Sequence, residues 1–313
     1  MTMNTSITSE KVTDGQKMQV KRLAEDAINR ASSGGILPDK ESGQMLVEKG
    51  DEFQSDILTS IRRLSASNKY KDEEFRAAYG YPKEYKGPKP IADQVKAIAE
   101  IFGLDPALAL EYAKKLPVLP EGAEGWFAIP SVDALVQKHF PEVTDPAEKY
   151  CRALQLVHQK IAESRSFYNY RDGQIDTAHI KVSARTLEKM NQIAAQQKGD
   201  PSTGSGPSIL IIAAQLGKRH GGRSVRRARE VFTANEYGLT SVAGSSIVLV
   251  HPERLVRWEE LDMDMAGDEF SDGGGGSFGR APYFLFDGKA GFDTEGVSYP
   301  FDNCGSASGF VSQ

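Results

Sequence analysis

The chain lacks several features that would place it in a definite class. No apolar run approaches the roughly 20 residues that a membrane-spanning helix needs. The first residues, MTMNTSITSEKVTDGQK, lack the basic and then apolar stretches of a secretion signal. The two cysteines, Cys151 and Cys304, are too few for a disulfide framework and too far apart for a zinc-type spacing. We therefore expect a cytoplasmic protein that does not associate with membranes.

Motifs of well-known catalytic sites are also missing. The sequence contains no G-x-S-x-G, H-E-x-x-H or C-x-x-C pattern. Gly217 and Gly222 have the separation of the P-loop glycines, but Arg223 stands where the P-loop lysine is required. Cys151 and His158 lie two turns apart on one expected helix, about 10 Å from each other, which favours burial over a catalytic pair. Whether the protein is an enzyme stays open at this point.

The pattern along the chain predicts an α+β protein with two parts. Residues 1–124 are polar at first and carry helical periodicity, as in Met18–Ala31 and Lys40–Val47, so we expect a helical N-terminal extension. Residues 125–313 contain both helical and strand patterns and form the expected mixed α/β globular body. A polar tail of this kind is ordered only when the body or a neighbouring subunit holds it.

Within the body, a strand–helix–strand pattern surrounds the most basic part of the chain. The apolar run at 208–215 predicts a buried strand, and Ser224 is a good cap for a helix that follows. A second apolar run, SIVLV at 246–250, predicts another buried strand and completes a short βαβ-like unit. From Arg280 onward, alternating glycine and aromatic residues predict an irregular antiparallel sheet.

The segment 218–229, KRHGGRSVRRAR, holds six Lys and Arg residues in a protein whose formal net charge is −5. It lies where a strand, a glycine-containing loop and a helix N-terminus meet, which is an arrangement that binds phosphate in other proteins. Arginine also suits fixed, bidentate contacts with phosphate or carboxylate groups. We therefore expect an anion-binding site formed by Lys218, Arg219, His220, Arg223, Ser224, Arg226 and Arg227.

An acidic counterpart follows in the sequence, which leaves the source of the anion open. The segment 259–272, EELDMDMAGDEFSD, holds seven carboxylates in fourteen residues. One interpretation is ion pairing between the two segments, within the fold or across a subunit interface. A second is an external nucleic-acid backbone or phosphorylated ligand, and a third is a solvated helix face without a ligand.

The acidic segment also suggests a divalent-metal site. Asp262, Asp264 and Gly267 match three positions of a calcium-binding loop, but Gly273 stands where the bidentate glutamate should be, so an EF-hand is excluded. A looser Ca²⁺ or Mg²⁺ site formed by Asp262, Asp264, Asp268 and Glu269 is the remaining interpretation. Together with the histidines and arginines, such a site would indicate phosphodiester hydrolysis.

The chain resembles an uncharacterised bacterial protein family in several ordered words: GKRHGGRSVRRAREVF, HPERL, AGDEF and GSASGF. The resemblance extends from Gly125 to the C-terminal end and departs at Gly221, where the family has an arginine. It implies that residues 125–313 form one unit, which disfavours a domain break at the loop 201–207. It implies no activity.

Our leading functional hypothesis is a non-enzymatic cytoplasmic protein whose basic loop binds an anion, either a nucleic-acid backbone or the acidic segment of another subunit. A competing hypothesis is a metal-dependent phosphoesterase, and a third is a self-assembling structural protein. We expect a homo-oligomer and no obligatory cofactor, with a divalent metal as the one candidate.

Overall fold

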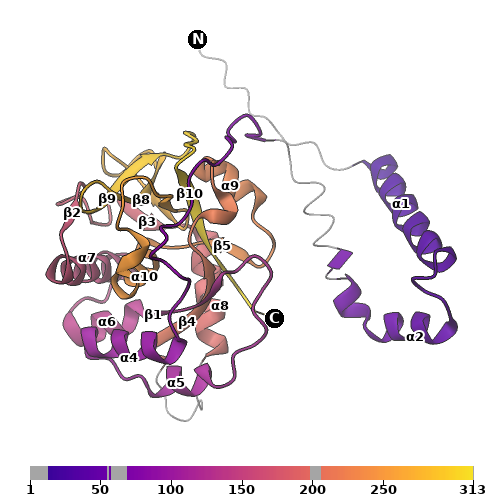
Figure 1. Ribbon diagram of the computed structural model, residues 1–313, viewed down its shortest axis with the longest axis horizontal. Helices are drawn as coiled ribbons and strands as arrows, with labels where there is room; N and C mark the ends of the chain where they lie inside the picture. The colour runs from indigo at the N-terminus through magenta and orange to yellow at the C-terminus, as the bar shows by residue number, and fades with distance from the viewer. Residues whose placement is uncertain (1–12, 55, 58–68, 198–205, 313) are drawn as a thin grey trace. The chain divides into compact units, whose positions relative to one another are not determined.

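The computed structural model describes residues 13–54, 56–57, 69–197 and 206–312 (Figure 1). The chain forms two compact units, residues 1–64 and residues 65–313. The body therefore begins before Gly125, the first residue of the body that the sequence suggested. Residues 58–68 and most of the loop 201–207 lie outside the described residues.

The first unit contains α1 (Asp14–Ser33) and α2 (Lys40–Glu48), at the positions that the periodicity predicts. Thr13 and Gln16 form a capping box at the start of α1, and Asp39 caps α2. Neither helix has a buried residue. Their apolar faces are therefore exposed: the side chain of Leu23, for example, is 69% accessible to solvent.

The second unit is an α+β body. Its helices are α4 (Ile91–Phe102), α5 (Ala107–Ala113), α6 (Val132–His139), α7 (Pro146–Ser164), α8 (Ala184–Gln196), α9 (Val225–Val231) and α10 (Ser241–Val250). Its strands are β1 (Gly125–Pro130), β2 (Phe167–Asn169), β3 (Ile180–Val182), β4 (Ile209–Gln215), β5 (Glu236–Gly238), β6 (Asp262–Met265), β7 (Asp268–Phe270), β8 (Arg280–Phe286), β9 (Ala290–Gly296) and β10 (Cys304–Phe310). Within the described ranges, no helix combines the length and the apolar character needed to cross a membrane.

The strands form one mixed sheet with the path β1-β4-β10-β6-β8-β7-β3. Strand β10 is central: it is antiparallel to β4 and β5 and parallel to β6. Strands β6 and β7 both pair antiparallel with β8, and the turn at Ala266–Gly267 separates β6 from β7. The acidic segment 259–272 is therefore largely an interrupted strand, and it has no calcium-loop conformation.

The strand expected at 246–250 is wrong, because these residues belong to the helix α10. Thr240 caps this helix, and all ten of its residues are buried. A short apolar run has no periodicity that separates a buried strand from a helix buried on all sides. The strand that follows α9 is β5, and β10 lies between β4 and β5. The strand–helix–strand unit therefore exists with a different second strand.

The core lies between the sheet and the helices and includes residues on both sides of position 124. Val95, Ile98 and Phe102 of α4 are fully or almost fully buried, as are Phe127 and Ile129 of β1. Gly103, which has the αL conformation, ends α4. Cys151 and His158 of α7 are both buried, as the helix pattern indicated. Residues 91–124 therefore contribute to the same core as residues 125–312.

Candidate functional site: an acidic pocket beside a neutralised basic loop

The basic segment contacts a segment that sequence reasoning did not connect with it. Residues 69–80, here called the strap, cross the loop between β4 and α9. The amide of Phe75 donates to the carbonyl of Gly222 at 2.7 Å, and the amide of Ser224 donates to the carbonyl of Glu73 at 3.1 Å. An isolated β-bridge joins Glu74 to Arg223 between these two bonds. The strap therefore lies where we expected a foreign anion.

Glutamates of the strap supply the negative charge. Glu73 binds the guanidinium of Arg226 and accepts a 2.6 Å hydrogen bond from the hydroxyl of Ser224. Glu74 forms ion pairs with Arg227 and, at 3.5 Å, with Arg223. The hydrogen bond from Arg226 holds the pKa of Glu73 below its usual value. Four of the seven expected anion-binding residues thus bind carboxylates of the same chain.

A further carboxylate, inside the body, binds two more of them. Nε2 of His220 lies 2.7 Å from a carboxylate oxygen of Glu236, and Arg219 approaches the same oxygen at 3.3 Å. Burial lowers the pKa of His220. Its Nδ1 accepts a 3.0 Å hydrogen bond from Arg223, so Nε2 carries the proton that is donated to Glu236. Burial alone would raise the pKa of Glu236, but the bonds from His220 and Ser308 outweigh it and place it at about 2. Lys218 is exposed, and no described carboxylate lies within 4.0 Å of its ammonium group.

One interpretation of the sequence was ion pairing between the basic and acidic segments within the fold. Four arginines of the basic segment have other carboxylate partners. The salt bridges of Arg219, Arg223, Arg226 and Arg227 go to Glu73, Glu74 and Glu236. Arg229 does reach the acidic segment, where it donates to the backbone carbonyls of Ala266 and Asp268. Local sequence patterns could not identify the glutamates of the strap as partners, because the strap precedes the basic loop by more than a hundred residues.

The four residues of the predicted metal site divide into two places. Asp268 accepts hydrogen bonds from the phenol of Tyr150 and the amide of Ser241, and Glu269 forms an ion pair with Lys181. Asp262 and Asp264, in contrast, line a pocket of about 240 Å³. Among the described residues, no group of three or more His, Cys, Asp or Glu side chains has the arrangement of a metal site.

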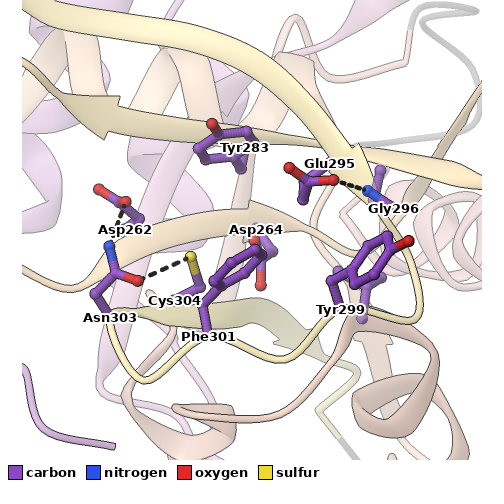
Figure 2. Close-up of a pocket in the computed structure, with 11 residues that line it drawn as sticks. Asp262, Asp264, Tyr283, Glu295, Gly296, Tyr299, Phe301, Asn303 and Cys304 are labelled. Carbon is purple, nitrogen blue, oxygen red and sulfur yellow. Dashed lines mark hydrogen bonds between the residues drawn. The ribbon is translucent and has the colours of Figure 1, made fainter. Parts of the chain in front are cut away.

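The floor of this pocket is one face of the sheet (Figure 2). Along β6, aspartate and methionine alternate, so the two residue types lie on opposite faces. Met263 and Met265 point into the hydrophobic core, so Asp262 and Asp264 point to the opposite face. In register, Asp262 lies opposite Cys304 of β10. Tyr283 of β8 lies opposite Asp264. The pattern DMDM therefore lets one strand contribute to the core on one face and to the pocket on the other.

Loop and helix residues form the walls. Tyr299, Phe301 and Asn303 come from the connection between β9 and β10, and Val225 comes from α9. Glu295, at the end of β9, adds a third carboxylate. Sequence reasoning missed these residues. The pattern FDTEG does place Glu295 away from the core residue Phe292. Only the strand register, which pairs Glu295 with Ala281 of β8, puts it on the same face of the sheet as Asp264.

Asp264 is buried and Asp262 is partly buried, and no described Lys, Arg or His side chain lies within 4.0 Å of their oxygens. The side chain of Asp264 is 7% exposed, and its near polar neighbour is the neutral hydroxyl of Ser306. Burial raises the pKa of Asp264 to about 7. Burial, and then the charge of Asp264, raise the pKa of Asp262 to about 7 as well. Asn303 donates to Asp262 at 3.1 Å, and Arg280 lies 3.9 Å from Glu295.

This arrangement favours the binding of positive charge. Three carboxyl groups face a partly open space together with the aromatic side chains of Tyr283, Tyr299 and Phe301. Carboxylates and aromatic faces are the groups that stabilise ammonium and guanidinium cations in proteins. The thiol of Cys304 also lines the pocket, but burial raises its pKa well above the usual value, so it is not a thiolate nucleophile.

Comparisons with protein-family models, with curated proteins and with solved structures found no match.

Proposed function

We propose that the body is a recognition module whose acidic pocket binds an ammonium or guanidinium group of a ligand. The observation that carries the proposal is the pair Asp262 and Asp264, two carboxyl groups that share one strand face and have raised pKa values. Bringing a cation between them would lower both pKa values and replace mutual repulsion by attraction. The nearby aromatic rings would cover the apolar part of the same ligand.

A small cation tests the proposal directly. Titration of the full-length protein with methylguanidinium, followed by NMR chemical shifts, should show saturable binding at pH 8 with a dissociation constant of about 1 mM or lower. Binding should weaken at least fivefold at pH 5.5, because the carboxyl groups are then protonated. Asp264→Asn should weaken binding at pH 8 by about tenfold, which is about 1.4 kcal/mol.

The control removes the same charge elsewhere. Asp287→Asn changes an exposed carboxylate in the turn between β8 and β9 and should leave the titration unchanged. Equal affinity of the wild type and Asp264→Asn would contradict the proposal, and so would equal affinity for neutral urea.

The functions that the sequence suggested for the basic loop and the acidic segment stay predictions. A nucleic-acid backbone at the basic loop would have to compete with Glu73 and Glu74, which already bind its arginines. A metal-dependent phosphoesterase would need Asp268 and Glu269 to leave Tyr150 and Lys181. Binding of a cation in the acidic pocket requires neither of these sets of contacts to break, and for that reason we prefer the pocket as the functional site.

A further inference from the structure

Large aromatic side chains around the pocket are exposed, which is unusual for residues of this size. Tyr299 and Phe301 line the pocket, yet their side chains are 62% and 41% exposed. On the neighbouring strap, Phe75 is 57% exposed and Tyr79 is 38% exposed. Together these four residues are called the aromatic rim. Single exposed apolar residues need no explanation, but a group of them beside a pocket marks an interaction surface.

Backbone hydrogen bonds place the strap beside the pocket. The carbonyl of Gly222 accepts from Phe75, while the amide of Gly222 donates at 2.8 Å to the carbonyl of Cys304, a pocket residue. Farther along, the amide of Ala78 donates at 3.1 Å to the carbonyl of Asp302, between Phe301 and Asn303 of the pocket wall. The strap therefore lies directly beside the pocket wall, and the two together are here called the docking surface.

We propose that this surface docks a basic peptide segment of a partner protein, with an arginine or lysine in the acidic pocket and apolar neighbours on the aromatic rim. The inference rests on the proposed function and names its ligand class. Charge complementarity selects a basic occupant. The rim distinguishes a peptide from a free small cation, which would leave Phe75 and Tyr79 uncovered because neither lines the pocket. Interfaces of this kind concentrate binding energy in a central anchor surrounded by aromatic side chains.

Three capped tripeptides separate the contributions of the pocket and the rim. Calorimetric titration should show that Leu-Arg-Leu binds about tenfold more tightly than Gly-Arg-Gly, because only the first has side chains for the rim. Leu-Gln-Leu, which lacks the cation, should bind at least tenfold more weakly than Leu-Arg-Leu. Each peptide carries an acetyl and an amide cap, so that its termini add no charge.

Variants of the strap assign the effect to the rim. Phe75→Ala and Tyr79→Ala should each weaken Leu-Arg-Leu binding about threefold to tenfold and leave methylguanidinium binding unchanged, because neither residue lines the pocket. The matched control is Tyr168→Ala, which removes an exposed tyrosine from β2. It should change neither titration.

The outcomes distinguish the two proposals. If methylguanidinium binds but Leu-Arg-Leu binds no better than Gly-Arg-Gly, the peptide surface is overturned while the cation pocket stands. Binding of spermidine as tight as that of Leu-Arg-Leu would assign the pocket to free polyamines and also overturn the peptide. If Leu-Gln-Leu binds as tightly as Leu-Arg-Leu, the cation has no role in peptide binding and the peptide proposal fails, whereas the cation pocket fails only if methylguanidinium does not bind.

Discussion

At the scale of single residues, Asp262 and Asp264 make the protein sensitive to pH in an unusual direction. The pKa of each is raised from the usual 3.8 to about 7, primarily by burial. The folded state therefore holds these protons more tightly than the unfolded chain does. The stabilisation from the neutral carboxyl groups is complete below about pH 4 and is lost as the pH rises through 7.

Replacing Asp264 by asparagine should remove part of this dependence, because the amide stays neutral at every pH. We expect Asp264→Asn to be more stable than the wild type at pH 8 by roughly 1–3 kcal/mol, and close to it at pH 5. Urea denaturation at both pH values measures the difference. Equal loss of stability at both pH values would contradict the prediction, because it would show that ionised Asp264 does not destabilise the folded state at pH 8.

Glu236 works in the opposite sense and shows what sequence can and cannot foresee about a residue. Its pKa of about 2 lies below the usual value of 4.5, so its contribution is present above about pH 4.5 and is lost as the pH falls toward 2. The basic segment predicted an anionic partner of open identity, and carboxylates of the same chain bind four of its arginines. The sequence could not identify Glu73, Glu74 and Glu236 as the partners, because pairing across distant segments depends on the fold.

At the scale of elements, the loop between β4 and α9 needs its glycines for a steric reason. Gly222 has φ +77°, and a Cβ atom there would overlap the carbonyl of Phe75 in the strap. A Cβ atom on Gly221 would lie 3.0 Å from the Cβ of Ala77. Glycines that resemble a phosphate cradle are thus required by the close approach of the strap.

The run at 246–250 also shows what local sequence cannot predict. Its burial in α10 follows from neighbours that lie elsewhere in the chain.

Gly222→Ala should therefore loosen the strap. Gly173 has nearly the same φ, +75°, with no atom within 4 Å of an added Cβ, so Gly173→Ala measures the backbone strain alone. We expect Gly173→Ala to cost about 1 kcal/mol and Gly222→Ala about 2–4 kcal/mol in urea denaturation. Tryptic cleavage at Lys71 and Arg76 should become faster only in Gly222→Ala. If both variants lost the same free energy of unfolding, the overlap with the strap at Gly222 would add nothing to the backbone strain, which would contradict the prediction.

At the scale of the whole molecule, the helices of the two units depend on different sources of stability. The sheet and the helices of the body enclose a core in which Ile211, Phe127 and Ile129 are almost fully buried. Helices α1 and α2 have no buried residue, so capping and propensity must hold them. Amphipathic periodicity predicted both kinds of helix equally well, because it reports which face is apolar and carries no information on whether that face is covered.

Amide hydrogen exchange should resolve this difference. Amides of α1 and α2 should exchange with protection below roughly 100-fold, since isolated helices of this length are marginal in water, whereas those of β4 and β10 should exchange only by global unfolding. Leu23→Ala should shift the melting temperature of the body by less than about 1 °C, whereas Phe127→Ala should lower its stability by about 3–5 kcal/mol. Strong protection of α1 that increases with protein concentration would instead show that its apolar face is covered by a second copy of the chain, which is the assembly that the polar tail led us to consider.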